Sequence, residues 1–147
     1  MTKDCFICNR IQQIKDGTNP YFVKELSTGY VVLADNQYYR GLTIFLGKEH
    51  KSELHEVAKD WRNTFLAEMA DVAEGVYRAF HPKKINYELL GNNERHMHWW
   101  IIPRYPDDAE PTWPIWTRDK QEIWSDQTKP SADELARLVA ELQSGLK

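Results

Sequence analysis

The chain has 147 residues and a formal net charge of −3 at pH 7, with 41% hydrophobic and 28% charged residues. This length and composition predict one soluble globular domain over 1–147, and the mild acidity argues against a protein that binds nucleic acids. No apolar run approaches the roughly 18 residues that cross a bilayer, and the N-terminus has no apolar signal core. We therefore expect a cytoplasmic protein without a membrane partner.

The first half of the chain predicts β-strands. The runs YFVKEL (21–26) and YVVLAD (30–35) are rich in β-branched and aromatic residues and surround a short turn that contains Gly29. This pattern is typical of a β-hairpin. A third apolar run, LTIFLG (42–47), predicts a third strand.

The middle of the chain changes its hydrophobic period. Over 57–80, hydrophobic residues recur every three or four positions, which predicts an amphipathic helix with one apolar face. The helix should end at His81, because a residue that precedes proline disfavours helical backbone angles. The runs INYELLGN (85–92) and HMHWWIIP (96–103) predict two more strands.

The remainder divides into an irregular segment and a helix. Residues 106–130 contain four prolines and several tryptophans, which predicts irregular structure packed over another part of the molecule. Ser131 begins a capping pattern for a final helix. We therefore expect an α+β fold in which 1–105 forms the core and 106–147 forms a Trp- and Pro-rich tail with a C-terminal helix. The sheet has about five antiparallel strands.

Two histidines stand one residue apart in the apolar run HMHWWIIP. On a strand, His96, His98 and Trp100 point to one face, because side chains alternate. Two imidazoles about 7 Å apart on one face can act together on one ligand or metal. The alternative is two histidines on a polar sheet face, but such an apolar strand favours a functional pair.

Four segments resemble the histidine triad family: CFICNRI, GKEHKSEL, NYELLGNNERHMHWWIIPRY and PIW. The resemblance covers 5–116 in the family's order and is strongest to the bacterial branch similar to diadenosine tetraphosphate hydrolases. It implies an antiparallel meander sheet with a long helix, paired into a homodimer. In the family pattern His-φ-His-φ-His, where φ is apolar, His96 and His98 match the first two histidines and Trp100 replaces the third.

The resemblance implies that His98 attacks the α-phosphate of a nucleotide and carries the nucleotidyl group as a covalent intermediate. A neutral imidazole is a good nucleophile, and the intermediate divides one difficult step into two. Asn86 and Asn92 match positions near the nucleotide, where an amide can donate to ribose or phosphate oxygens. His96 and Trp100 are also expected to contact this small-molecule partner. The implied enzyme is a nucleotide hydrolase or nucleotidyl transferase.

Arg95 and Arg104 flank the predicted histidine strand, and their charges have two possible roles. Arg95 and Arg104 could bring positive charge to the phosphates of a nucleotide. We favour the interpretation that each is a solvated surface charge.

Trp100 removes a proton carrier from the pattern. An indole donates one hydrogen bond and cannot transfer a proton at neutral pH. We therefore expect slower reaction of substrates whose amine leaving group needs a proton than of substrates with a phosphate leaving group. The alternative is a protein that binds nucleotides without converting them, or a zinc-stabilised interaction protein.

Cys5 and Cys8 form a C-x-x-C pair, which is compatible with half a zinc site, a redox pair or two incidental cysteines. The resemblance implies zinc, because His50 and His96 match positions that bind it in some members of the family. Two cysteines and two histidines would hold a structural Zn²⁺ in a closed tetrahedral site. The competing assignment adds His98 as a ligand in an open site.

Overall fold

A computed structural model describes residues 4–147 and contains a five-stranded antiparallel sheet in the order β1-β2-β3-β5-β4. The strands are β1 (Phe22–Glu25), β2 (Gly29–Leu33), β3 (Thr43–Gly47), β4 (Lys84–Glu88) and β5 (His98–Arg104). The α-helices are α1 (Phe6–Lys15), α2 (Lys59–Phe80), α3 (Lys120–Trp124) and α4 (Ala132–Gly145), and the short 3₁₀ helices are Leu54–Glu56, Ile115–Thr117 and Asp126–Thr128. The α+β fold expected from the sequence is confirmed.

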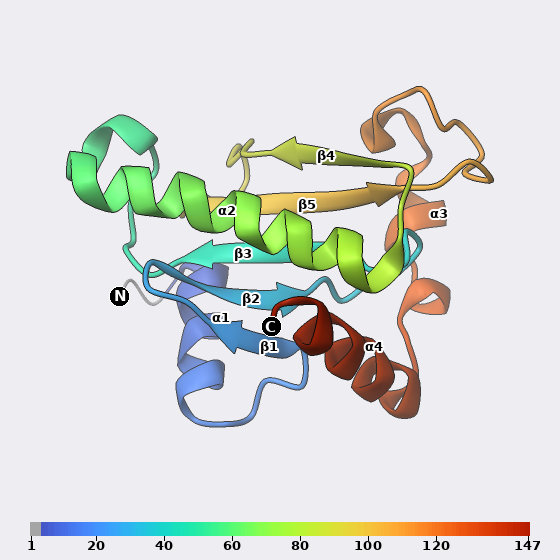
Figure 1. Cartoon of the computed structure of the whole chain (residues 1–147), viewed down its shortest axis with the longest axis horizontal. Coiled ribbons are helices and arrows are strands. Elements are labelled where there is room, and N and C mark those ends of the chain that lie inside the picture. Colours follow the sequence, from blue (N-terminus) through green and yellow to red (C-terminus); the bar gives the residue numbers. More distant parts are fainter. Residues whose placement is uncertain (1–3) are drawn as a thin grey trace.

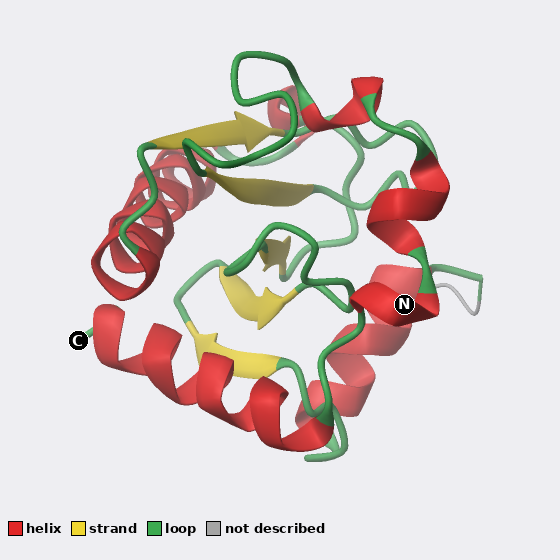
Figure 2. Ribbon diagram, turned by 90° about the vertical axis from the view of Figure 1, so that its right-hand side faces the viewer, coloured by secondary structure: helices red, strands yellow, loops and turns green. Residues whose placement is uncertain are grey.

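Helices cover both faces of the sheet (Figures 1 and 2). The long helix α2 and the C-terminal helix α4 pack on one face, which we call the α2 face. Helix α1 and the segment around α3 pack on the other, which we call the α1 face. A five-stranded sheet with two covered faces explains why β2 is buried along its whole length.

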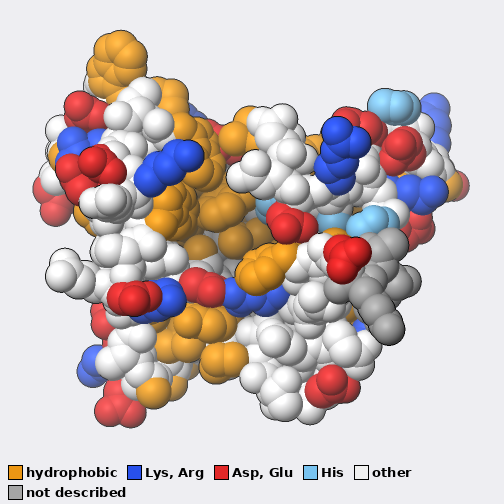
Figure 3. Space-filling model, turned by 180° about the vertical axis from the view of Figure 1, so that it is seen from behind, with side chains coloured by type: hydrophobic (Ala, Val, Ile, Leu, Met, Phe, Trp, Pro, Cys, Tyr) orange, Lys and Arg blue, Asp and Glu red, His pale blue; other side chains and the backbone are white. Residues whose placement is uncertain are grey.

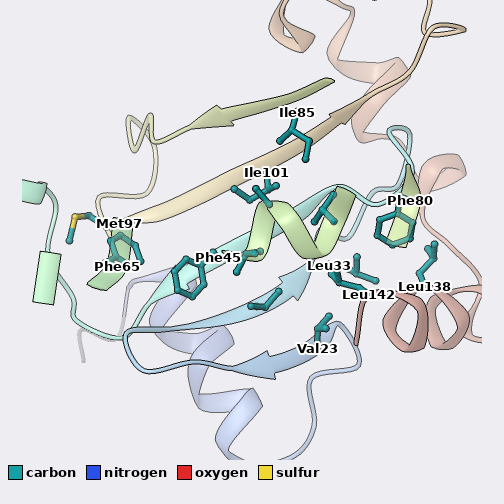
Figure 4. Close-up of a cluster of buried hydrophobic side chains, with 14 of the residues drawn as sticks. Val23, Leu33, Phe45, Phe65, Phe80, Ile85, Met97, Ile101, Leu138 and Leu142 are labelled. Carbon is teal, nitrogen blue, oxygen red and sulfur yellow. The ribbon is translucent and has the colours of Figure 1, made fainter. Parts of the chain in front are cut away.

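The main hydrophobic core lies on the α2 face (Figure 4). Phe45 and Ile101 from the sheet and Phe65 from α2 are fully buried there, and Leu138 and Leu142 extend this core to α4. Helix α4 therefore belongs to the same core as the sheet. Among residues 4–147, no helix is both long and apolar enough to cross a membrane.

The predicted elements of the middle of the chain are present with shifted ends. Helix α2 ends at Phe80, and His81 adopts a left-handed conformation with φ of 51° immediately before Pro82. The loop between β4 and β5 is longer than predicted, because β4 ends at Glu88 and β5 begins only at His98. His96 therefore precedes the strand on which it was placed.

Helix α1 is absent from the elements expected on the basis of sequence. The sequence pattern for this helix is short, because only Ile7, Ile11 and Ile14 recur at helical spacing. Ile7 and Ile11 are buried against the α1 face of the sheet. Cys5 caps the helix, since its Sγ accepts a hydrogen bond from the backbone N–H of Cys8. The predicted C-x-x-C pair therefore lies at the N-terminus of α1, with Cys5 as its cap and Cys8 in its first turn.

Candidate active site and adjoining metal centre

His98 opens β5 and points to the α1 face of the sheet. Its Nδ1 lies 2.7 Å from the carbonyl oxygen of His96. A carbonyl only accepts hydrogen bonds, so Nδ1 carries the proton and Nε2 keeps its lone pair. Burial lowers the pKa of His98 below its usual value, and the hydrogen bond to the His96 carbonyl opposes that shift. Burial thus favours the neutral imidazole over the cation.

A pocket of about 230 Å³ lies beside His98 and has mainly apolar walls from α1, β2 and β3. We call it the apolar pocket; Phe6, Val32 and Ile44 are among its lining residues. Hydrophobic side chains gather in a hollow on this side of the molecule (Figure 3). The volume and character suit a flat heteroaromatic group.

An ion pair between Arg10 and Asp35 is the main polar feature of the apolar pocket. The Arg10 guanidinium also lies over the rings of Phe6 and Tyr21, 4.9 and 5.3 Å from their centroids. These contacts hold the Asp35 carboxylate at the end of β2, where it can accept hydrogen bonds from a ligand. Sequence reasoning missed both residues; the only signal was a polar residue directly after an apolar strand.

A second pocket, of about 610 Å³, is also lined by His98. Trp100, Trp116 and Trp124 line it, and we call it the aromatic pocket. Asn92, predicted to contact the nucleotide, also lines this pocket. Trp100 lines both pockets, which is compatible with the predicted contact to a nucleotide.

Cys5, Cys8, His50 and His96 come together next to this site, with ligand atoms that all lie within 4.8 Å of one another. Cys8 Sγ is 3.2 Å from His50 Nδ1 and 3.4 Å from His96 Nδ1, and Cys5 Sγ is 3.5 Å from His96 Nδ1. Zinc bond lengths of about 2.3 Å to sulfur and about 2.0–2.1 Å to nitrogen imply S···N edges of about 3.5–3.6 Å in a tetrahedron. The three S···N distances are therefore close to those of a tetrahedral zinc site.

His96 has both ring nitrogens engaged. While Nδ1 faces the two cysteines, Nε2 lies 2.6 Å from the carbonyl oxygen of Gly47 and donates to it. Such a second hydrogen bond is the usual support of a histidine that binds a metal. His96 also lines neither of the pockets beside His98. The geometry therefore favours a metal-binding over a nucleotide-binding role for His96, and His98 lies outside the four-residue cluster.

Asn86 and Arg104 are joined by a hydrogen bond, and neither lines the two pockets beside His98. Arg104 is only 4% exposed, so the expectation that it is a solvated surface charge is wrong. It pairs with Asp108 at 3.0 Å and donates to the side-chain oxygen of Asn86 and to the carbonyl oxygens of Glu110 and Trp113. Asn86, predicted to lie near the nucleotide, is half-buried, and its side-chain oxygen accepts the hydrogen bond from Arg104. Arg95, in contrast, is exposed as expected.

Several solved structures resemble this chain in three dimensions. A histidine triad protein from Bradyrhizobium japonicum is 17% identical with a TM-score of 0.74, and the alignment covers 92% of this chain and 95% of that one. One from Sinorhizobium meliloti 1021 is 22% identical with a TM-score of 0.73, covering 84% and 87%. A Zn-bound histidine triad family protein from Mycobacterium smegmatis is 19% identical with a TM-score of 0.62, covering 96% of each chain.

No protein-family model matches the sequence, and no curated protein matches it significantly. The three-dimensional comparisons nevertheless cover 84–96% of this chain with TM-scores of 0.62–0.74. The similarity of the sequence segments noted above is thus matched by similarity of the whole architecture. The chain has the fold of the histidine triad proteins.

Proposed function

We propose that this protein is a nucleotide hydrolase or nucleotidyl transferase that acts through His98. The observation that carries the proposal is the hydrogen bond from Nδ1 of His98 to the His96 carbonyl, which leaves Nε2 as the nucleophilic nitrogen. His98 lines both the apolar and the aromatic pocket, so that a substrate could extend from one into the other past this side chain. The histidine triad fold of the chain supports a small-molecule nucleotide as the substrate.

The proposed reaction has two steps. The Nε2 lone pair of His98 forms a bond to the α-phosphorus, and the bond from phosphorus to the leaving group breaks with its electron pair on the leaving group. Water or an acceptor phosphate then attacks the same phosphorus, and the N–P electron pair returns to the imidazole. A phosphate leaving group needs no proton, which suits a site with Trp100 in place of a third imidazole.

We also propose that Cys5, Cys8, His50 and His96 hold a structural zinc ion. The Zn-bound Mycobacterium smegmatis protein supports this assignment, as do the S···N distances. Bound zinc would supply a cross-link between the start of α1 and the loop before β5. Zinc held there would keep His96 in place, and the carbonyl oxygen of His96 accepts the hydrogen bond that orients His98.

Product analysis tests the proposed reaction. Purified protein is incubated with dinucleoside polyphosphates and nucleoside phosphoramidates, with His98→Ala in parallel. We expect release of mononucleotide by the wild type and not by the variant. Absence of release from every compound by the wild type would reject the catalytic proposal for that panel. Saturable nucleotide binding in that case would favour the binding protein that Trp100 suggests.

A further inference from the structure

The metal cluster of Cys5, Cys8, His50 and His96 is open to solvent on one side. Three of the four residues are buried, whereas His50 is exposed. Cys8 Sγ lies 3.2 Å from Nδ1 of this exposed histidine. Displacement of the His50 side chain alone would therefore let a small solute such as hydrogen peroxide reach the sulfur of Cys8.

The two sulfur atoms of the cluster lie close together on one helical turn. Cys5 is the N-cap of α1 and Cys8 lies in its first turn, and their Sγ atoms are within 4.8 Å of each other. The backbone N–H of Cys8 donates to the Sγ of Cys5, which holds the two residues together. Cys-X-X-Cys pairs in disulfide oxidoreductases exchange between a dithiol and a disulfide. The chain has no other cysteine, so any intramolecular disulfide joins these two.

The same turn of α1 forms part of the apolar pocket. Phe6 and Ile7 stand between the two cysteines in sequence, and both line the pocket beside His98. The partners of the cysteines come from other parts of the fold, because His50 follows β3 and His96 lies in the loop before β5. A metal held by all four residues would therefore fix one wall of the pocket to two loops of the sheet.

We propose that Cys5 and Cys8 form a reversible oxidation site, at which hydrogen peroxide converts the two thiolates into a disulfide and the cluster loses its zinc. The inference rests on the proposed zinc site and goes beyond it, because it assigns the two cysteines a second chemical state. A disulfide sulfur lacks the negative charge with which a thiolate binds zinc. His50 and His96 are then the only ligands left, which is too few for a closed tetrahedral site.

The oxidation has two balanced steps. The Cys8 thiolate attacks one oxygen of the peroxide, so that an S–O bond forms, the O–O bond breaks and hydroxide leaves. The Cys5 thiolate then attacks the sulfur of this sulfenic acid, so that an S–S bond forms and the S–O bond breaks with a second hydroxide as the leaving group. The two sulfurs lose two electrons in total, and these reduce the peroxide to two hydroxide ions.

Oxidation would replace a long-range cross-link by a local one. Cys5 and His96 are 91 residues apart in the sequence, whereas Cys5 and Cys8 are 3 apart. A disulfide across so short a segment constrains only the first turn of α1 and does not tie it to the sheet. Phe6 and Ile7 would then line the apolar pocket without this anchor, so the oxidised protein should bind a nucleotide more weakly.

Treatment of the zinc-loaded wild type with hydrogen peroxide tests the proposal. A chromogenic chelator measures released zinc, the intact-protein mass measures the disulfide, and hydrogen exchange measures the mobility of residues 4–15. We expect one zinc to be released for each disulfide, with faster exchange in 4–15 and unchanged exchange in α4, which packs on the opposite face of the sheet. Dithiothreitol with added zinc should reverse these changes, whereas an oxidised methionine needs a dedicated reductase.

Two variants of the cluster serve as controls. Cys5→Ser keeps Cys8 but cannot form the intramolecular disulfide, so peroxide should not raise its exchange in 4–15 above the untreated level. His50→Ala keeps both sulfurs and removes the exposed ligand that shields them, so its disulfide should form faster than that of the wild type. Zinc-loaded wild type whose thiols stay reduced in peroxide, or whose disulfide forms while zinc is retained, would overturn the oxidation site.

Calorimetric titration with AMP measures the effect on the apolar pocket. We expect the oxidised wild type to bind AMP at least about tenfold more weakly than the reduced, zinc-loaded protein, because only molecules with α1 in place are competent to bind. Equal affinities would overturn the link between the cysteines and the pocket.

These measurements also keep this inference separate from the proposed function. A purified protein without zinc would overturn the metal site and the oxidation site together, and would leave the reaction at His98 standing. Absence of AMP binding by the reduced protein would count against the proposed reaction, while zinc release and hydrogen exchange would still decide the oxidation site.

Discussion

Trp100 sets which proton transfers the site can perform. An imidazole in its place could protonate an amine leaving group, which an indole cannot do. We predict that Trp100→His raises kcat/KM for adenosine 5′-phosphoramidate at least tenfold relative to that for ATP, because a positioned acid contributes about 10²–10⁴-fold. The measurement is AMP release from both compounds, with Trp100→Phe as the control. Equal changes on the two compounds would show that Trp100 acts only by its volume.

Arg104 acts on stability rather than on phosphate binding. Its guanidinium and its partner Asp108 are both buried, so loss of the arginine leaves an unpaired buried carboxylate. We predict that Arg104→Ala lowers the free energy of unfolding by about 3–5 kcal/mol, and that Arg104→Lys recovers little, because lysine lacks the planar fork.

Urea denaturation measures both Arg104 variants. Arg78→Ala is the matched control, because Arg78 forms an exposed ion pair with Glu74 four residues earlier in α2. Exposed pairs of this kind contribute less than about 1 kcal/mol. An Arg104→Ala protein as stable as the Arg78→Ala protein would contradict the structural role.

At the scale of elements, the metal cluster joins α1 to the rest of the fold. Helix α1 buries only a small apolar face through Ile7 and Ile11, so its attachment should depend on the cross-link near Cys5. We predict that the purified protein contains one zinc per chain, and that its removal by a chelator lowers the melting temperature. Elemental analysis and thermal denaturation measure these two quantities.

Variants of the cluster separate a metal effect from a general loss of stability. Cys5→Ser and His50→Ala should lose zinc, while His55→Ala, at an exposed histidine of the neighbouring 3₁₀ helix, should keep it. Retention of zinc by both cluster variants would argue against these four ligands. Loss of zinc without a change in melting temperature would argue against a structural role.

The elements themselves show where local sequence patterns are sufficient. Helix α2 was predictable almost to the residue, because its hydrophobic period extends over 22 residues and ends at a proline. Residues 89–92 and 96–97 were predicted as strand but belong to the loop between β4 and β5, because the sequence pattern does not reveal the left-handed turn at Gly91. Helix α1 was missed because ten residues contain too few repeats of the period.

At the scale of the whole molecule, one edge of the sheet is a candidate surface for dimer formation. Strand β4 is an edge strand, and Tyr77 on α2 and Tyr87 on β4 are exposed beside it. Exposed edges and large apolar side chains are typical of association sites. Together with the resemblance to histidine triad proteins, this predicts a homodimer in solution.

Light scattering after size exclusion should give about twice the chain mass of 17.3 kDa. Tyr87→Glu should shift the mass toward the monomer, because it places a charge on the predicted interface. Tyr38→Glu, at an exposed tyrosine away from β4, should leave the dimer unchanged. A monomeric wild type at micromolar concentration would refute this assembly.

The sequence by itself determined the strands, α2, α4 and the importance of the His-x-His segment, because each depends on residues close together in the chain. Only the tertiary structure decided which groups each histidine contacts. Cys5 meets His96 across 91 residues, and Trp116 meets Glu88 across 28. Such contacts arise when the sheet and the tail pack together, and no local period encodes them. They separate His96, held by cysteines and a carbonyl, from His98, which is left to face the two pockets.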